Sequence, residues 1–540
     1  MTQSFTRRVI TTLATIIFAL TAAMAQKPQL VVNIIIGSMR SNDIERYTSN
    51  LSDNGFKRLA NGGVVYNNAC YDYALTSSAA GLATLATGTQ PSIHGAIGEY
   101  WWNYTDESRV SLIGDPKACP VPFSTGAGSY SPHRLSCPTL GDMLTAANPE
   151  SKSFTVAIDP LSALLLTGHS GVAYWPETNK TNWTTSSAYL HELPLWVRNY
   201  NANQTNSMYT LKRWTPLYAA STYRNNEVAV IEDIKNKSTK LISDVNLQLA
   251  NSPIGAMRYT PAGNTMLLEF ASMLIAQERL GSDSAPDILN ICLDTSRYIA
   301  STYGPESMEY EDMLYRLDKD IEEFLTFLYA QIKDPRHIVV VVVTSDHGTS
   351  PSYNPIGSTA RERFNVRQME VIVNAFLGAR YGSDHYVMGF ANNALYLNHR
   401  ILLEKHLAIE AIREEVATFL LQMRGVATAI SASSLRNTSF ADGRSRLVQQ
   451  SFYATRSGDI LIDFMPGWII EDSAVRSASD AGYNYDRKVP LIIYGTGIAG
   501  SYSEEVSMVM VAPTIARLLG IEQPWASTAT PLKECITTKR

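Results

Sequence analysis

Cysteine is scarce in this 540-residue chain, which contains only Cys70, Cys119, Cys137, Cys292 and Cys535. Five cysteines at such irregular spacing do not fit a cysteine-based zinc cluster. Cys119 and Cys137 both lie beside prolines in a loop-rich stretch, so an oxidising compartment would allow one disulfide between them. The alternative, two separate thiols, remains open at this point.

An excess of basic residues is also absent. The net charge is −5, with 45 Lys and Arg against 50 Asp and Glu, and the basic residues are scattered. This distribution lacks the clustered positive charge that nucleic-acid binding requires. Beyond the first 25 residues, no segment reaches the roughly 18 uninterrupted apolar residues typical of a membrane-spanning helix. The mature chain is therefore predicted to bind no nucleic acid and to have no membrane span.

The first 25 residues are of a different kind. Arg7 and Arg8 precede an apolar run over residues 9–22, and the small residues Ala23-Met24-Ala25 follow. This order is typical of a secretory signal peptide, with cleavage near Gln26. No cysteine follows the cleavage site, which disfavours a lipoprotein. We therefore expect an exported protein, either periplasmic or secreted.

The rest of the chain is too long for one simple core, which predicts a large α/β domain with insertions. Core segments are predicted at residues 26–177, 282–350 and 467–540. Residues 178–281 are polar and rich in Asn, Tyr, Ser and Trp, so they are expected to form an inserted cap. Residues 351–466, with a helix predicted over 407–421 and short strands, are expected to form an inserted α+β subdomain.

Three apolar runs, over residues 30–36, 287–293 and 338–343, predict buried strands of a mostly parallel sheet. Asp346 and His347 follow the third run, where open α/β sheets place their chemistry, and together they are a natural pair of zinc ligands. A short helix is predicted over residues 78–87. Ser78 would then lie at a helix amino terminus that favours negative charge, unless Ser77 or Ser78 is merely the cap.

Several motifs occur in an order that is similar to the alkaline phosphatase superfamily, in its exported bacterial phosphate-irrepressible branch near the nucleotide pyrophosphatase/phosphodiesterases. The resemblance runs from about Pro28 to Leu532 and implies a mostly parallel central sheet with helices on both faces. It also implies two zinc ions that clamp a displacement at phosphorus and activate an alkoxide nucleophile. The motifs include Leu30-Val31-Val32, Met39-Arg40, Gly88-Thr89, His94-Gly95, Arg456-Ser457-Gly458-Asp459, Tyr485-Asp486 and Ala512-Pro513-Thr514.

On this resemblance, Ser78 takes the position of the nucleophile, and Asp346 and His347 are retained metal ligands. The other metal positions carry residues that cannot replace the family's aspartates and histidines. The positions that hold the phosphate have also changed, because an asparagine, a lysine and an arginine are replaced. The substituted metal positions are Gly37, Arg297, Ser301 and Ser479, and the substituted phosphate positions are Glu99, Asp159 and Leu161.

These departures predict a pseudophosphatase that needs no cofactor and has a binding or scaffolding role. A protein, glycan or small-molecule partner would bind through the cap, with four aromatic residues as candidates, although the same residues could instead form the core of the cap. The candidates are Trp183, Tyr189, Trp196 and Tyr200.

The rival hypothesis is a residual one-metal phosphomonoesterase or phosphodiesterase that uses Ser78 as nucleophile. Its zinc would be held by Asp346, His347 and Asp480. Asp480 is adjacent to Ser479, however, and neighbouring side chains point in opposite directions in extended structure.

A charged residue in place of a ligand needs a partner. Because an unpaired buried ion is costly, we expect Arg297 to contact Asp346 or Glu99 and to fill the space of the missing metal. For Asp294, His94 and His169 we expect structural roles.

Overall fold

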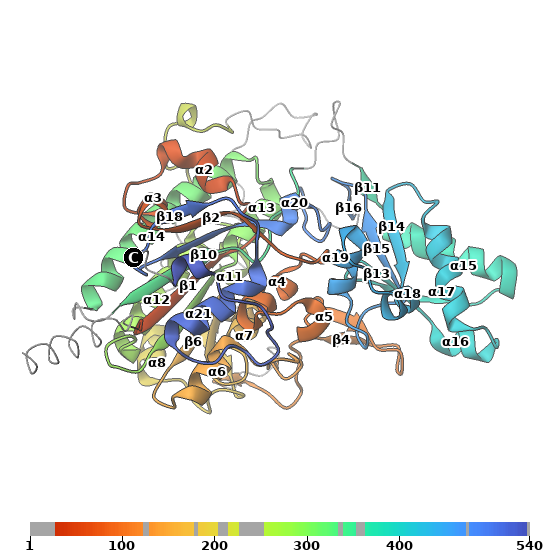
Figure 1. Ribbon diagram of the computed structural model, residues 1–540, viewed down its shortest axis with the longest axis horizontal. Coiled ribbons are helices and arrows are strands. Elements are labelled where there is room, and N and C mark those ends of the chain that lie inside the picture. Colours follow the sequence, from red (N-terminus) through yellow and green to blue (C-terminus); the bar gives the residue numbers. More distant parts are fainter. Residues whose placement is uncertain are drawn as a thin grey trace, which may run out of the picture.

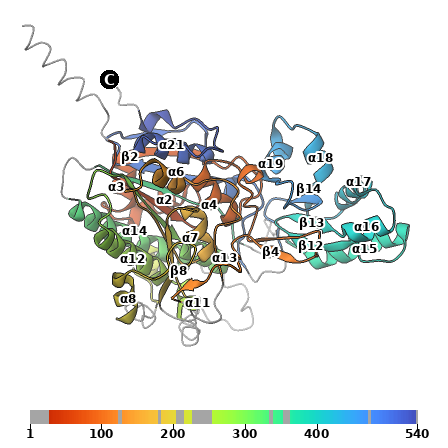
Figure 2. The ribbon, with the colours of Figure 1, turned by 90° about the horizontal axis from the view of Figure 1, so that it is seen from below.

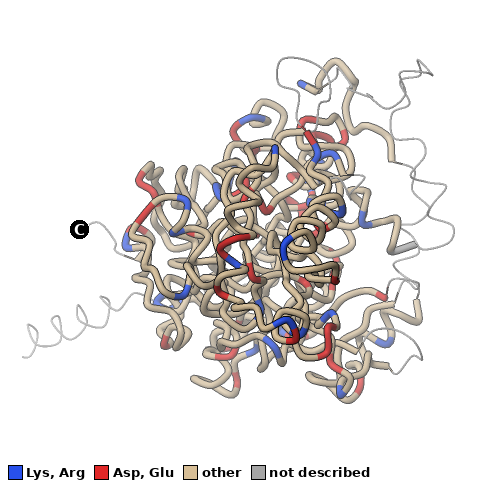
Figure 3. Tube along the Cα trace, turned by 90° about the vertical axis from the view of Figure 1, so that its right-hand side faces the viewer, with Lys and Arg blue, Asp and Glu red and all other residues tan. Residues whose placement is uncertain are grey.

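The computed structural model describes residues 27–122, 129–177, 182–203, 214–225, 253–332, 338–352, 362–470 and 475–536 (Figure 1). The predicted signal peptide lies outside these residues. Within them, no helix combines the length and apolar character needed to cross a membrane. Lys and Arg are interspersed with Asp and Glu along the trace (Figure 3).

The centre of the molecule is an eleven-stranded sheet built around β1 (Leu30–Ile36). β1 lies between β9 (Asp287–Leu293) and β10 (Val339–Thr344), and all three strands are parallel. On the β9 side the sheet continues in parallel through β6 (Ser153–Ala157) and β7 (Val172–Pro176). On the β10 side follows β17 (Lys488–Tyr494), which is antiparallel to β10, and then β2 (Gly63–Cys70), which is antiparallel to β17 and so runs in the direction of β10. Shorter strands complete the edges: β5 (Pro120–Val121), β8 (Trp183–Ser186), β18 (Gly500–Tyr502) and β19 (Val506–Ser507).

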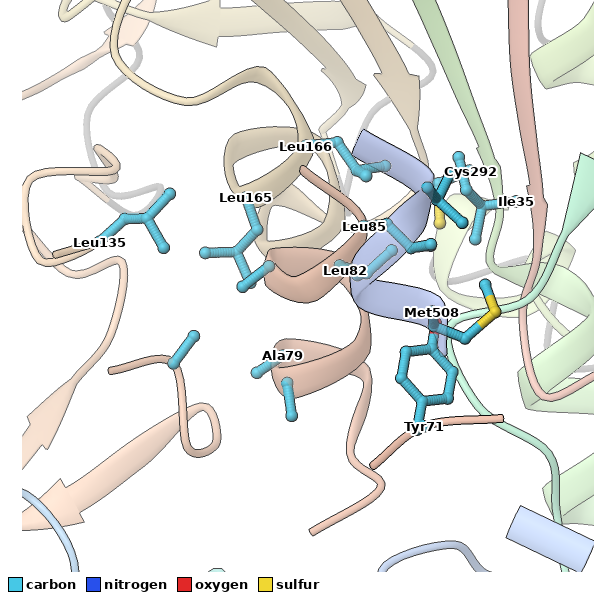
Figure 4. Packing of buried hydrophobic residues seen from close by; sticks show 14 of the residues in the cluster. Ile35, Tyr71, Ala79, Leu82, Leu85, Leu135, Leu165, Leu166, Cys292 and Met508 are labelled. Carbon is cyan, nitrogen blue, oxygen red and sulfur yellow. The ribbon is translucent and has the colours of Figure 1, made fainter. Parts of the chain in front are cut away.

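Helices cover both faces of this sheet (Figure 2). The side chains of β1 alternate between two buried clusters: Val31 and Ile35 face one, and Val32 and Ile34 face the other. The first cluster is closed by α4 (Ser78–Thr87), α6 (Leu140–Ala147), α7 (Pro160–Thr167) and α21 (Val511–Leu519). Figure 4 shows this packing, with Leu82 and Leu85 of α4 between α7 and Ile35. The second cluster is closed by α3 (Phe56–Gly62), α12 (Ala262–Glu278) and α14 (Met308–Gln331).

This architecture confirms the predicted fold class, a mostly parallel sheet with helices on both faces. Shorter helices lie in the connections between these elements: α2 (Asp43–Tyr47), α5 (Pro91–His94), α8 (Leu195–Ala202), α11 (Pro253–Met257), α13 (Thr295–Tyr303) and α20 (Asn484–Arg487). A small antiparallel pair, β3 (Tyr100–Trp102) and β4 (Arg109–Ser111), lies beyond α5.

A second, four-stranded antiparallel sheet lies to one side of the main body in both ribbon views (Figures 1 and 2). Its strands are β12 (Val387–Ala391), β13 (Ala394–Leu397), β15 (Ile460–Phe464) and β14 (Val426–Ser431), in this order. Together with α15 (Val366–Tyr381), α16 (His399–Glu404) and α17 (Ile409–Leu420) they enclose a separate apolar cluster. α18 (Ala432–Asn437) and α19 (Gly443–Ser451) lead back towards the main body, and β11 (Arg363–Phe364) pairs with β16 (Ile469–Ile470). The boundaries predicted for the core segments, the inserted cap and the inserted α+β subdomain stay predictions.

The cysteines are unpaired thiols. Cys137 is buried and Cys119 half-buried, so the structure favours the alternative of two separate thiols over a disulfide between them.

Candidate active site

The site is built at the amino terminus of α4. Ser77 is the cap of this helix, because its side chain accepts a hydrogen bond from the Ala80 N–H at 3.3 Å. Ser78, the first residue of the helix, is therefore not needed as a cap, and its hydroxyl contacts His347 and Arg297 instead. Gly81 allows α4 to approach the loop after β10, since a Cβ at this position would lie 1.8 Å from the Asp346 carbonyl oxygen. The closeness of helix and loop brings Ser78 next to His347.

Ser78 and His347 form a buried hydrogen-bonded pair. The Ser78 Oγ lies 3.0 Å from the His347 Nε2. The other ring nitrogen, Nδ1, lies 2.6 Å from the Gly348 carbonyl oxygen, which can only accept a hydrogen bond. Nδ1 therefore carries a hydrogen, and Nε2 faces the Ser78 Oγ and, at 3.4 Å, the Asp346 Oδ2.

Asp346 is held as a carboxylate next to this pair, with its Oδ2 3.4 Å from the His347 Nε2. Its Oδ1 accepts hydrogen bonds from the Ser38 and His347 N–H groups, each at 3.0 Å. Burial by itself would raise the pKa of Asp346, but the charges of His347 and Arg297, together with hydrogen bonds, outweigh this effect and lower it. Asp346 therefore supplies a fixed negative charge to the site.

Arg297 contacts the nucleophile position itself. Its Nη1 donates a hydrogen bond to the Ser78 Oγ, and its Nη2 donates to Asp159 Oδ2 at 2.5 Å and to Asp294 Oδ1 at 3.3 Å. The prediction that Arg297 contacts Asp346 or Glu99 is thus wrong. The reason is local geometry: Arg297 lies in the first turn of α13, three residues after Asp294, with Asp159 opposite it at the start of α7. Asp346 acts on Arg297 only through space.

The Asp159 position, where the resemblance places a phosphate-binding residue, is saturated by donors from this chain. Besides Arg297, the Tyr298 hydroxyl donates to Asp159 Oδ2 at 2.6 Å, and Arg258 Nη1 lies 3.6 Å from its Oδ1. Burial, with the nearby charge of Asp159, raises the pKa of Asp294 to about 6. Arg297 therefore serves as counter-charge for the buried Asp294 and the partly buried Asp159.

The other predicted positions are more distant from the nucleophile or have other roles. A Cβ at Gly37 would lie 3.0 Å from the Arg297 Cβ, so this position borders the site. The Ser301 Oγ donates to the Tyr298 carbonyl oxygen within α13. Leu161 faces the apolar cluster under α7, and Glu99 is exposed. Ser479 lies in the loop 475–482, which the neighbouring Ala478 holds against residue 350.

Asp480 was expected to point away from the side of Ser479, on the assumption that the backbone is extended here. Its φ of +76° is left-handed, so the alternation expected of extended backbone does not apply. Its Oδ1 is buried and has no hydrogen-bond partner in the structure. Burial raises the pKa of Asp480 to about 6, with the charge of His347 acting against the rise and that of Glu99 adding to it. The run Asp480-Ala481-Gly482 could have indicated this turn from the sequence, because aspartate and glycine both tolerate left-handed backbone angles.

The residues present do not fit the zinc centre of the family. Asp346 and His347 provide two ligands, whereas catalytic zinc usually takes three from the protein, and Asp480, the third ligand of the one-metal hypothesis, does not form a metal-binding group with them. The hydroxyl that would add another, Ser78, already contacts the guanidinium of Arg297. In the part of the chain that the structure describes, no three His, Cys, Asp or Glu side chains are grouped so that they could hold a metal ion.

The aromatic residues proposed as a binding surface pack mainly into the apolar clusters on the faces of the central sheet. The Trp183 ring stacks on Phe270 at a centroid distance of 3.7 Å, and Trp196 and Tyr200 contact the same ring at 5.3 and 5.4 Å. The Tyr189 hydroxyl donates to the Gly168 carbonyl oxygen. These contacts agree with the alternative of a core role for the four rings: Trp183, Trp196 and Tyr200 join the second apolar cluster, and Tyr189 packs against the first.

His94 and His169 have the structural roles expected of them. His94 is fully buried, with Nε2 3.2 Å from Thr84 Oγ1 and Nδ1 accepting the Ala96 N–H. His169 Nδ1 lies 3.0 Å from an oxygen of Asp142. Asp294, also expected to be structural, is in addition a counter-ion of Arg297.

Comparisons with known proteins agree with this fold. The model of the family described as type I phosphodiesterase / nucleotide pyrophosphatase matches residues 31–484. Alkaline phosphatase PafA from Elizabethkingia meningoseptica is 29% identical over 520 residues, which cover 94% of this chain and 95% of PafA. Alkaline phosphatase PhoV from Synechococcus elongatus is 28% identical over 511 residues, with 93% and 92% covered.

A crystal structure of wild-type PafA superposes with a TM-score of 0.87 and covers 94% of this chain and 99% of its own. Sequence and structure thus agree over nearly the whole length. The chain therefore belongs to the type I phosphodiesterase / nucleotide pyrophosphatase family, within the alkaline phosphatase superfamily.

Proposed function

We propose that this protein is a pseudophosphatase, which keeps the fold of its family, does not hydrolyse phosphate esters, and acts by binding a partner. One observation carries the proposal: the Arg297 guanidinium donates a hydrogen bond to the Ser78 Oγ, the atom that a metal would activate. A guanidinium supplies one positive charge and no site for a bound hydroxide.

The charges around Ser78 support the same conclusion. Asp346 interacts with both Ser78 and His347, Asp480 acts electrostatically on His347, and Arg297, which contacts Ser78, is already paired with Asp159 and Asp294. A phosphate dianion would therefore meet the acids Asp346 and Asp480, together with an arginine whose charge is already shared with Asp159 and Asp294. Each lost donor or metal contact to a developing oxyanion typically costs about 3–4 kcal/mol, so their joint loss removes most of the catalysis.

The test combines metal content with turnover. Protein purified without chelators should contain far less than one equivalent of zinc. Hydrolysis of p-nitrophenyl phosphate and bis-p-nitrophenyl phosphate should not exceed that of Ser78→Ala, even with added zinc, manganese or magnesium. Turnover that disappears in Ser78→Ala or with EDTA would instead support the one-metal phosphomonoesterase or phosphodiesterase.

Restoring the family's ligands gives a positive control. The combined variant Gly37→Asp, Arg297→Asp, Ser301→His and Ser479→His should recover zinc binding more than turnover, because Glu99, Asp159 and Leu161 still replace the donors to phosphate. Titration with zinc measures the first effect and p-nitrophenyl phosphate the second. Full turnover without zinc binding would contradict the assignment of these positions.

The binding role is proposed for the cap. A surface cavity of about 410 Å³ lies between α8 and α12, and its lining residues are Trp196, Asn199, Tyr200, Asn203, Glu269, Met273 and Gln277. Aromatic edges beside amides suit a glycan or another polar ligand. Glycan-array binding by the wild type that is lost in Trp196→Ala would support this role, and identical arrays would contradict it.

Export is proposed from residues 1–25, which have the order of a signal peptide. Cell fractionation should find the full chain outside the cytoplasm and a variant lacking residues 2–25 inside it.

A further inference from the structure

We infer that the cavity between α8 and α12 binds the sugar rings of a neutral oligosaccharide and discriminates against uronic acids. We call this cavity the cap groove. The inference rests on the binding role proposed for the cap and names the class of its ligand. Three features carry it: aromatic rings that are fixed in place, side-chain amides on both helices, and an acidic residue that has no basic neighbour among the described lining residues.

The cap groove is an elongated space between two helix faces. Its volume, about 410 Å³, falls in the range of small-ligand sites. Along α12 three lining residues, Glu269, Met273 and Gln277, follow one another at intervals of four, so they form a row of about 12 Å. Such a row suits a short chain of sugar rings. The other wall is one face of α8, where the lining residues recur at intervals of three and four: Trp196, Asn199, Tyr200 and Asn203.

Two aromatic rings of the groove are fixed before a ligand binds. The Trp196 Nε1 donates to Glu278 Oε1 at 2.8 Å, and the Trp196 ring lies 5.3 Å from that of Phe270. The Tyr200 ring meets Phe270 edge-on at 5.4 Å and belongs to the second apolar cluster. Because the indole N–H is already engaged, the partly buried Trp196 offers the groove mainly apolar ring surface. A fixed aromatic surface can stack on the C–H face of a sugar ring at little entropic cost.

Side-chain amides supply the hydrogen bonds. Asn199 and Asn203 of α8 and Gln277 of α12 are exposed and line the groove. Each carboxamide offers two donor hydrogens and an acceptor oxygen, and a sugar hydroxyl also both donates and accepts. An acyl chain in the groove would instead cover these amides and leave them unpaired, which is costly. The amides therefore favour a sugar over a lipid.

Charge selects among sugars. Glu269 is the one charged residue among the described residues that line the groove, and it lies close enough to act electrostatically on Tyr200. A second acid, Glu278, holds the edge of Trp196. A carboxylate, sulfate or phosphate on the ligand would meet like charge here. A neutral sugar ring uses the aromatic surface and the amides without that repulsion.

The experiment uses the full protein on an array of neutral oligosaccharides, each paired with a uronic-acid oligosaccharide of the same length and linkage. Cellotetraose and β-1,4-linked tetraglucuronate are one such pair. We expect neutral members to bind more tightly than their uronate partners. Calorimetric titration with the best neutral probe should show at least about a tenfold loss of affinity in Trp196→Ala, and a smaller loss in Trp196→Phe, which keeps an aromatic face.

A second pair of variants tests the charge. Glu269→Gln should raise the affinity for the matched uronate about two- to fivefold, as expected for a partly exposed charge pair, and high salt should reduce this gain. Glu192→Gln is the matched control, because it removes an exposed acid just before α8 that is not among the described lining residues. It should bind both probes like the wild type.

Uronates that bind as tightly as their neutral partners, or more tightly, would overturn this inference and leave the binding role of the cap intact. No oligosaccharide binding by the native protein, or binding that Trp196→Ala leaves unchanged, would overturn both. Native circular dichroism spectra of the variants exclude misfolding as the cause of lost affinity. Phosphatase turnover would end the pseudophosphatase proposal and leave this inference standing.

Discussion

At the scale of single residues, Arg297 links the two helices that border the site. It neutralises Asp159 from α7 and Asp294 from the start of α13. We predict that Arg297→Met lowers the free energy of unfolding by about 3–5 kcal/mol, because the buried carboxylate of Asp294 loses its counter-ion and Asp159 loses the nearer of its two arginines. Denaturant unfolding measures this loss.

A double-mutant cycle isolates the ion pair. In the background of Asp159→Asn, the cost of Arg297→Met should fall by at least about 1 kcal/mol, since one of the stranded charges is gone. Strictly additive losses would show that the contact contributes little.

His94 gives a prediction for acid conditions. Burial, with the charge of Arg456, lowers the pKa of His94 to about 3, well below the 6.5 expected in the unfolded chain. As the pH falls below 6.5 the unfolded state gains a proton that the folded state excludes, so stability declines by about 1.4 kcal/mol per pH unit. Between pH 6.5 and 5 the wild type should lose about 2 kcal/mol more than His94→Gln.

Thr84→Val is the control for this effect. It removes a hydrogen-bond partner of His94 but keeps the imidazole, so it should lower stability without flattening the pH dependence. A parallel decline in the wild type and in His94→Gln would contradict the buried, neutral state of His94.

The sequence predicted which residues belong to the site, but it did not predict which groups those residues contact. The resemblance predicted that Ser78 lies close to Asp346 and His347, although more than 260 positions separate them in the sequence. The contact between Ser78 and His347 spans 269 positions. It could not give the partners of Arg297, which depend on how α13 and α7 face each other. Nor could it give the direction of Asp480, which depends on one left-handed backbone angle.

At the scale of elements, α4 depends on Ser77. We predict that Ser77→Ala costs about 1 kcal/mol, because it removes the cap of the helix. Hydrogen exchange should accelerate at the Ala80 amide, which donates to the Ser77 side chain. In Ser78→Ala this amide should stay protected, whatever happens to reactivity. Equal exchange in the two variants would show that Ser77 is not the cap.

The elements themselves were largely readable from apolar runs. Residues 30–36 and 287–293 form strands with the predicted ends, and the third run is shifted by one residue, to Val339–Thr344. Contacts between residues that are distant in the sequence were harder to predict. The aromatic residues of the cap have a composition typical of either a core or a binding surface, and only the contacts with Phe270 distinguish the two.

At the scale of the whole molecule, Arg456 connects the four-stranded sheet region to the main body. Its guanidinium donates to the carbonyl oxygens of Gly95 and Arg134 and lies over the ring of Trp101. We predict that Arg456→Ala costs about 2–3 kcal/mol, as expected for lost hydrogen bonds from a charged donor. Exchange should rise in residues 93–102 and 453–459, while β1 and β10 stay protected.

Arg436→Ala is the matched control, because Arg436 donates to the Ala454 carbonyl within the same region and does not bridge to the main body. It should leave residues 93–102 unchanged. Exchange that rises throughout the central sheet in Arg456→Ala would show that the two parts unfold as one unit.

The position of β1 in the centre of the sheet has a consequence for biosynthesis. Asn33 of β1 is in register with Asn290 of β9, 257 residues further along the chain, and β10 is made later still. At about 5–20 residues per second, the ribosome completes the neighbours of β1 only tens of seconds after β1 itself. Until then an almost wholly apolar strand has no partner, so its aggregation, rather than the stability of the finished fold, should limit the yield of native protein.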